Sequence, residues 1–175
     1  MLVSIVVPVY NEEASLERCW RELTVVLEGL AQPFEVLMVD DGSRDSGWDV
    51  LSALAADPST GGRLRGLRLS RNFGKEAAIL AGLRQVRGDA VIVMDADLQH
   101  PPDLIPRMLE LWDGGRVAVV EAVKRQRQPE SWPLRLAARL YYRLFILASG
   151  MDLRCSSDFK LLDRRVVEQY AGLPE

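Results

Sequence analysis

The 175-residue chain predicts an α/β fold with a mostly parallel sheet and helices on both faces. Short apolar runs alternate along the chain with segments whose apolar residues recur at helical spacing. Such β-α-β alternation builds a parallel sheet that the intervening helices cover on both faces. With 48% hydrophobic and 27% charged residues, the chain is long enough for one sizeable core. We therefore expect residues 1–175 to form a single domain.

Five segments are expected to be strands, because each is a short run rich in β-branched and other apolar residues. They are Val3–Val9, Phe34–Asp40, 67–70, 89–95 and 117–123. Between the first two strands, apolar residues at helical spacing from Leu16 to Leu30 define one helix face. Further helices are predicted at 45–56, 75–86 and 102–112, the last with proline in its first turn.

Charge is unevenly distributed along the chain. Residues 116–175 carry eleven Lys/Arg and seven Asp/Glu (net +4), against eleven and eighteen in residues 1–115 (net −7), which sums to −3. The second part is therefore expected to face something anionic. Cys19 and Cys155 have neither metal-ligand spacing nor disulfide density, which favours a reducing compartment, and Cys19 is expected to pack in the core. Neither a secretory signal nor a membrane span is predicted.

The fourth predicted strand ends in Asp95-Ala96-Asp97-Leu98-Gln99. Open α/β sheets bind ligands at the carboxyl ends of their strands. Two carboxylates one residue apart repel each other unless a cation lies between them, and a hard divalent ion prefers oxygen ligands. The motif therefore predicts a metal that holds substrate phosphates. The alternative is that each aspartate only caps a turn or the next helix.

Polar residues also follow the other strands at the same predicted edge. After the first strand come Tyr10, Asn11 and Glu12, where Asn11 is alternatively a helix N-cap. Asp40 ends the second strand and is suited to accept hydrogen bonds from a base or ribose, although Asp-Gly-Ser is also ordinary turn chemistry. Lys75 lies near a helix start, where the helix dipole disfavours a cation, and this favours an anionic ligand.

Taken together, these motifs resemble the family 2 glycosyltransferases of the GT-A (Rossmann-like) fold, over residues 3–165. Residues 95–99 and 157–164 are most similar to the polyprenyl-phosphate glycosyltransferases, the dolichol-phosphate-mannose synthase and bactoprenol glucosyltransferase group. The resemblance implies a metal-dependent inverting enzyme that transfers a hexose from a UDP- or GDP-linked donor to polyprenyl phosphate at the cytoplasmic membrane face. Relatives often continue into membrane spans, so we expect a C-terminally truncated chain with a donor-binding part (1–115) and an acceptor and membrane-facing part (116–175).

The resemblance also implies the site residues. Mg²⁺ or Mn²⁺ is expected on Asp95, Asp97 and Gln99, with Asp97 also catalytic. His100, the only histidine, is interpreted as lying outside the ligand set. Donor binding is expected of Pro8, Tyr10, Asn11, Glu12, Asp40, Asp41, Lys75, Asp95 and Ala96.

Asp158 is the second catalytic candidate, because inverting members place an aspartate near the acceptor as a general base. A lipid monophosphate, with a second pKa of about 6, is already ionised near neutral pH. Asp158 is then expected to position the acceptor or bind the metal, and the structural alternative is an ion pair with Lys160 or Arg164. Cationic groups suit phosphate oxygens. The acceptor phosphate is therefore assigned to Lys124, Arg125, Arg127, Lys160 and Arg164.

Residues 132–148 read as a basic amphipathic helix with Arg135, Arg139 and Arg143 along one face. Such a helix is typical of a segment that lies on anionic lipid, and the alternative is a core-packed helix with a solvated arginine face. Two other functions stay open: a family 2 enzyme with a polysaccharide or other non-lipid acceptor, and a phospho-receiver-like signalling module. The receiver hypothesis leaves Gln99 and the Asp158 segment without a role. No nucleic-acid partner is implied, and a homo-oligomer stays open.

Overall fold

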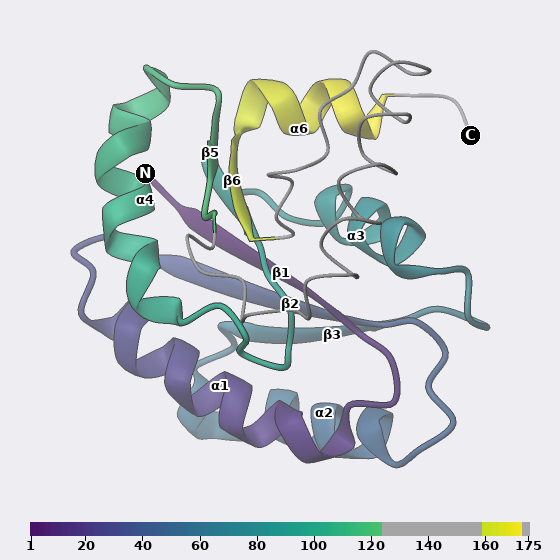
Figure 1. Ribbon diagram of the computed structural model, residues 1–175. Helices are drawn as coiled ribbons and strands as arrows, with labels where there is room; N and C mark the ends of the chain where they lie inside the picture. The colour runs from purple at the N-terminus through teal and green to yellow at the C-terminus, as the bar shows by residue number, and fades with distance from the viewer. Residues whose placement is uncertain (124–158, 173–175) are drawn as a thin grey trace, which may run out of the picture.

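The computed structural model describes residues 1–123 and 159–172 (Figure 1). Six strands form one sheet in the order β3-β2-β1-β4-β6-β5. The parallel strands are β1 (Val3–Val9), β2 (Phe34–Asp40), β3 (Leu64–Arg68) and β4 (Ala90–Val93). β6 (Lys160–Asp163) runs antiparallel to both its neighbours, β4 and β5 (Val119–Glu121). The predicted α/β fold with a mostly parallel sheet is confirmed.

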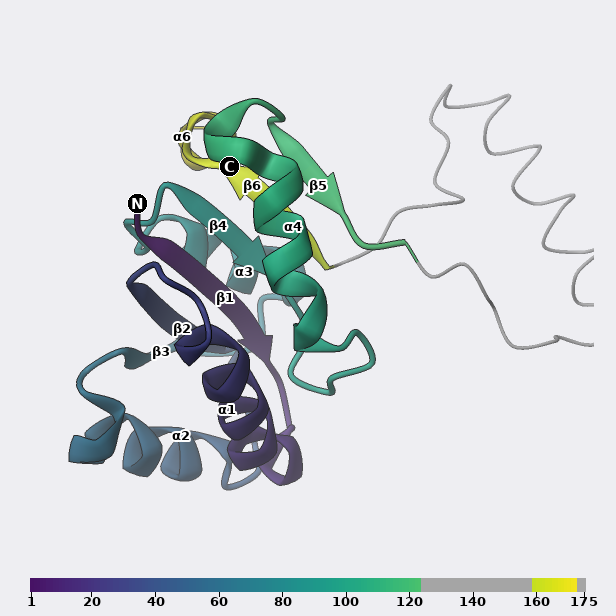
Figure 2. The same ribbon diagram turned by 90° about the vertical axis from the view of Figure 1, so that its left-hand side faces the viewer.

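Helices cover both faces of the sheet, as Figure 2 shows from the side. α1 (Glu13–Glu28), α2 (Gly47–Ala56) and α4 (Ile105–Trp112) pack on one face, and α3 (Lys75–Leu83) and α6 (Arg164–Ala171) pack on the other. Short 3₁₀ helices occur at Pro58–Thr60, Pro102–Leu104 and Asp113–Gly115. This arrangement explains why β1 is apolar on both sides, because Ile5 packs in the core beneath α1, α2 and α4, and Val6 packs in the core beneath α3 and α6.

Three elements depart most from the sequence prediction. β3 begins at Leu64 and ends at Arg68, earlier than the predicted 67–70. Gly66 lies inside this strand, where an added Cβ would come within 3.2 Å of Leu51 and Trp48. The glycine thus admits the close approach of α2 instead of interrupting the strand. β6 and α6 were not predicted, since elements of four and eight residues are too short to show a clear period.

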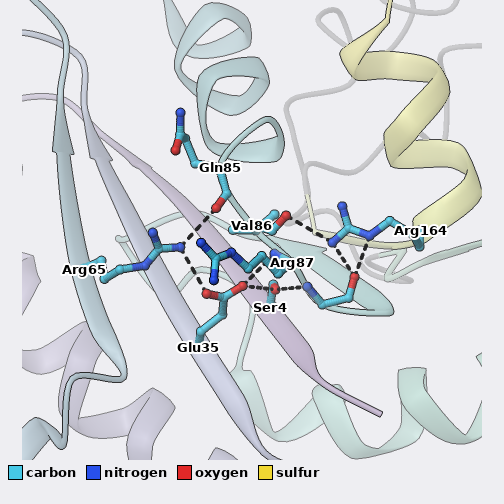
Figure 3. A network of polar contacts seen from close by, with 8 residues as sticks. Ser4, Glu35, Arg65, Gln85, Val86, Arg87 and Arg164 are labelled. Atoms are coloured by element: carbon cyan, nitrogen blue, oxygen red, sulfur yellow. Dashed lines mark hydrogen bonds and ion pairs between the residues drawn. The ribbon is translucent and has the colours of Figure 1, made fainter.

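At the edge opposite the strand carboxyl ends, a polar network ties the parallel strands together (Figure 3). Glu35 of β2 accepts hydrogen bonds from Ser4 Oγ (2.7 Å) and the Arg87 N–H (2.8 Å), and it pairs with Arg65 (3.0 Å). Ser4 Oγ accepts in turn from the Gly88 N–H at 2.8 Å. Burial raises the pKa of Glu35, but the hydrogen bonds from Arg87 and Ser4 and the charge of Arg65 outweigh it and hold the pKa below its usual value.

Candidate active site

A cavity of about 330 Å³ opens where β1, β2 and β4 end. Parallel strands bring their carboxyl ends to one edge, and the segments that follow the strands therefore meet there. Eight of the predicted residues line the cavity together with Val9, Asn72 and Gly74, which were not predicted. The eight are Pro8, Tyr10, Glu12, Asp41, Lys75, Asp95, Ala96 and Asp97.

The acidic wall of the cavity follows β4. The Asp95 carboxylate lies 2.7 Å from Lys75 Nζ, and the two side chains are 31% and 38% exposed. Asp97 is exposed, and its Oδ1 accepts a hydrogen bond from the Gln99 N–H at 3.0 Å. Leu98, between them, adopts a left-handed conformation with φ of +57°. This side-chain-to-backbone turn presents Asp97 to the cavity, whereas Gln99 does not line it.

Asp41 fixes a second part of the cavity wall. Its two carboxylate oxygens accept hydrogen bonds from the backbone N–H groups of Phe73 (2.8 Å) and Gly74 (2.9 Å), and its side chain is buried. Gly74 has φ of +97° and directly precedes Lys75, the first residue of α3. The carboxylate of Asp41 therefore sets the turn from which Lys75 enters the cavity.

Asp40 is only 1% exposed and lies beside the cavity without lining it. Its Oδ1 accepts from the Ser43 N–H at 3.0 Å, and its Oδ2 lies 3.2 Å from Arg68 Nε. Among the described residues no donor has hydrogen-bond geometry to Oδ2, so the contact with Arg68 is electrostatic only. A buried carboxylate oxygen with spare acceptor capacity is suited to a ligand N–H or hydroxyl.

Asn11 connects two loops instead of lining the cavity. Its Oδ1 accepts from the Arg44 N–H, and its own N–H donates to Ser43 Oγ, both at 2.9 Å. The residue is left-handed, with φ of +54°, and the N-cap of α1 is Glu12. The N-cap hypothesis for Asn11 is therefore wrong, because the asparagine is used to hold the β1 and β2 loops together.

The predicted acceptor residues are separated by the direction of β6. Lys160 pairs with Val93 at the cavity end of β4. Because β6 is antiparallel, the chain reaches the opposite edge by Arg164, whose Nε donates to the Gly88 carbonyl at 2.8 Å (Figure 3). The fold does not bring Arg164 to the cavity. Lys124, Arg125, Arg127, Asp158 and residues 132–148 lie outside the described residues.

The donor set fits a hard divalent ion. Within residues 1–123 and 159–172, no group of three or more His, Cys, Asp or Glu side chains is arranged to hold a metal. Asp95 and Asp97 nevertheless offer carboxylate oxygens in the cavity wall, and among the described residues the cation paired with Asp95 is Lys75. Two protein carboxylates completed by phosphate and water oxygens is the usual arrangement for Mg²⁺.

Comparison with known proteins assigns the family. The glycosyl transferase family 2 model matches residues 4–171. The chain belongs to glycosyl transferase family 2. An uncharacterized glycosyltransferase of Synechocystis is 38% identical over 174 residues, which cover 99% of this chain and 54% of the relative. An undecaprenyl-phosphate 4-deoxy-4-formamido-L-arabinose transferase of Serratia proteamaculans is 42% identical over 151 residues, which cover 86% of this chain and 45% of the relative.

Solved structures share the GT-A fold of this family 2 chain. A mannosyltransferase of Pyrobaculum calidifontis in complex with GDP-Man and Mn²⁺ has a TM-score of 0.68 at 22% identity, over 98% of this chain and 47% of its own. A glucosyl-3-phosphoglycerate synthase of Mycobacterium tuberculosis in complex with Mn²⁺, UDP and phosphoglyceric acid has a TM-score of 0.66 at 22% identity. The match covers 94% of this chain and 56% of the synthase chain. The chain spans about half the length of the curated relatives. No helix of the described ranges has the length and apolarity needed to cross a membrane.

Proposed function

We propose that this chain is the catalytic domain of a metal-dependent inverting glycosyltransferase that moves a hexose from a nucleoside diphosphate sugar to polyprenyl phosphate. The observation that carries the proposal is the cavity in which Asp95 and Asp97 face the loop that Asp41 fixes. This arrangement offers anionic ligands for a divalent ion and a lysine for phosphate within one site. The relative named for undecaprenyl phosphate supports the acceptor class.

The donor is held in two parts. Asp40 Oδ2 accepts a hydrogen bond from the base or ribose, since it is buried beside the cavity with acceptor capacity to spare. Tyr10, which is part of the cavity wall, offers an aromatic surface for the nucleoside. Asp95 and Asp97 hold Mg²⁺ or Mn²⁺ at the diphosphate, with Gln99 as the third proposed ligand. Structural neighbours were crystallised with GDP-Man and with UDP, so both GDP-linked and UDP-linked sugars are donors to be tested.

The residues of the site act mainly on the leaving group. A metal held by Asp95 and Asp97 would stabilise the negative charge that develops on the β-phosphate oxygen as the nucleoside diphosphate departs from the sugar. Lys75 contributes a further positive charge to the same oxygens. The acceptor phosphate is already ionised near neutral pH, so its alignment limits the reaction more than its deprotonation does. Asp158 is proposed to provide this alignment.

The acceptor side completes the proposal. Lys160, at the cavity end of β6, is proposed to contact the acceptor phosphate together with Lys124, Arg125 and Arg127. Residues 132–148 are proposed to lie on the anionic surface of the cytoplasmic membrane face and to bring the polyprenyl chain within reach. Arg164 is omitted from this set, because its guanidinium donates to the carbonyls of Val86 and Gly88.

Sugar transfer tests the proposal directly. The chain is incubated with UDP- or GDP-linked hexoses and short-chain polyprenyl phosphate, with Mg²⁺, Mn²⁺ or EDTA. Transfer is expected to require the metal and to fall at least about a hundredfold in Asp97→Ala, as is typical when one transition-state charge partner is removed. Glu17→Ala, which removes an exposed carboxylate of α1, is the matched control. Undiminished transfer in EDTA, or transfer to a polysaccharide only, would contradict the proposal.

The membrane part is tested separately by flotation with anionic liposomes. Reversing the charges of Arg135, Arg139 and Arg143 is expected to abolish flotation while leaving nucleotide binding intact, because the arginines act on lipid headgroups. Equal flotation of the variant and the parent chain would remove residues 132–148 from the proposal.

A further inference from the structure

The contact between Lys75 and Asp95 joins two groups to which the proposed function gives different ligands. Lys75 Nζ lies 2.7 Å from Asp95 Oδ1. The proposed donor assigns Lys75 to phosphate oxygens and Asp95 to a divalent cation. Within residues 1–123 and 159–172 each group therefore has the other as a counter-charge, and the two must part before donor and metal are bound as proposed.

The surroundings favour an exchange of partners over a permanent pair. Both side chains are about one-third exposed, and ion pairs between partly solvated groups are weak. Lys75 has a fixed backbone, because Asp41 holds the two preceding N–H groups, but its ammonium is carried on a flexible four-carbon stem. The first turn of α3 gains nothing from a cation, since the helix dipole disfavours it there.

We propose that Lys75 acts as a resident counter-charge that closes Asp95 to metal until a nucleoside diphosphate arrives. The diphosphate carries more negative charge than one carboxylate, so Lys75 moves to it and leaves Asp95 open to the cation. Nucleotide and metal then strengthen each other's binding by one common factor, as linkage requires. This inference rests on the proposed function and adds an order to its binding steps.

The distinguishing test is Mn²⁺ binding in the absence of nucleotide. Free Mn²⁺ is measured by its electron paramagnetic resonance signal during titration of the 175-residue chain, alone and with saturating UDP or GDP. The Mn²⁺ bound by free nucleotide is determined separately and subtracted. Lys75→Met is expected to bind Mn²⁺ alone about two- to fivefold more tightly than the parent chain, because an exposed ion pair no longer competes. The same variant is expected to bind nucleotide alone more weakly.

Two further variants define the outcome. Lys75→Arg keeps a competing cation and is expected to retain weak Mn²⁺ binding in the absence of nucleotide. Arg71→Met removes the same charge from the same loop, outside the cavity wall, and is expected to leave the ratio of Mn²⁺ Kd values without and with nucleotide unchanged. In Lys75→Met this ratio is expected to fall two- to fivefold. Lys75→Gln repeats the measurement should the methionine variant fail to fold.

Mn²⁺ binding to Lys75→Met that is equal to or weaker than that of the parent chain overturns the inference. Mn²⁺ binding that is undetectable in every nucleotide-free variant also overturns it, because removal of the competitor then opens no site. Failure of the proposed function looks different: the parent chain itself binds neither UDP nor GDP with Mn²⁺ and transfers no sugar.

Discussion

Replacing Asp41 by alanine is expected to lower the free energy of unfolding by about 2–4 kcal/mol. The carboxylate accepts two backbone hydrogen bonds, of 2.8 and 2.9 Å, from Phe73 and Gly74, and it is 3% exposed. Each hydrogen bond to a charged group contributes about 1.5–3 kcal/mol, and the sum is reduced because water reaches the partly buried N–H groups once the carboxylate is gone. For a chain of this size the loss corresponds to a fall in Tm of about 4–16 °C.

Thermal and urea unfolding followed by circular dichroism measure this loss. Asp41→Asn keeps one acceptor oxygen and is expected to fall between the parent chain and Asp41→Ala. Glu17→Ala removes an exposed carboxylate and is expected to change stability by no more than about 0.5 kcal/mol. A loss below about 1 kcal/mol in Asp41→Ala would show that the loop before α3 holds its shape without the carboxylate, and would refute the reasoning.

Three further predictions concern other parts of the fold. The pKa of Glu35 is lowered, so its contribution to stability is complete above the ordinary value of about 4.3 and is lost as pH falls through the lower folded-state value. Glu35→Gln should therefore flatten the acid dependence of the urea midpoint, and equal slopes in both chains would contradict this. Gly42→Ala is expected to lower the free energy of unfolding by about 1–3 kcal/mol more than Gly62→Ala does. Both glycines have positive φ, but only at Gly42 would a Cβ lie 2.5 Å from the Arg71 backbone. Equal urea midpoints of the two variants would refute this steric argument. Burial raises the pKa of Cys19 to about 12, so iodoacetamide at pH 8 should modify it only in urea, as peptide mass mapping reports, and rapid labelling of the folded chain would contradict the core position.

The fold was predictable where one physical signal dominated. β1 and β2 have the predicted bounds, because both are mostly apolar strands buried on the two faces of the sheet. β3 was misplaced, because its Arg65 and Gly66 interrupt the apolar pattern. The reason for Gly66 is the packing of α2 on the strand, which only tertiary structure shows. Sequence periodicity indicates which residues are buried. It fails where a neighbouring element packs so closely that only a small residue fits, as at Gly66.

The cavity was predictable for a topological reason. Residues that directly follow parallel strands meet at one edge wherever the chain order places them, and this brought Glu12, Asp41 and Asp95 together. The same rule did not predict the position of Arg164, because β6 runs antiparallel to β4 and this direction is set by the pairing of the two strands. Asn72 was missed for a different reason, since a lone amide in a loop has no signal beyond its position after β3.

The adjacent carboxylates of Asp40 and Asp41 show how hydrogen-bond accounting separates roles that a motif joins. Both are buried; Asp40 is the last residue of β2 and Asp41 directly follows it. Both carboxylate oxygens of Asp41 accept hydrogen bonds from the backbone N–H groups of Phe73 and Gly74. Asp41 therefore acts by holding the loop that carries Lys75. Asp40 keeps an oxygen without a hydrogen bond among the described residues, and therefore retains capacity for a ligand. Loss of Asp41 should consequently impair binding of the diphosphate through Lys75, and loss of Asp40 should impair recognition of the nucleoside itself.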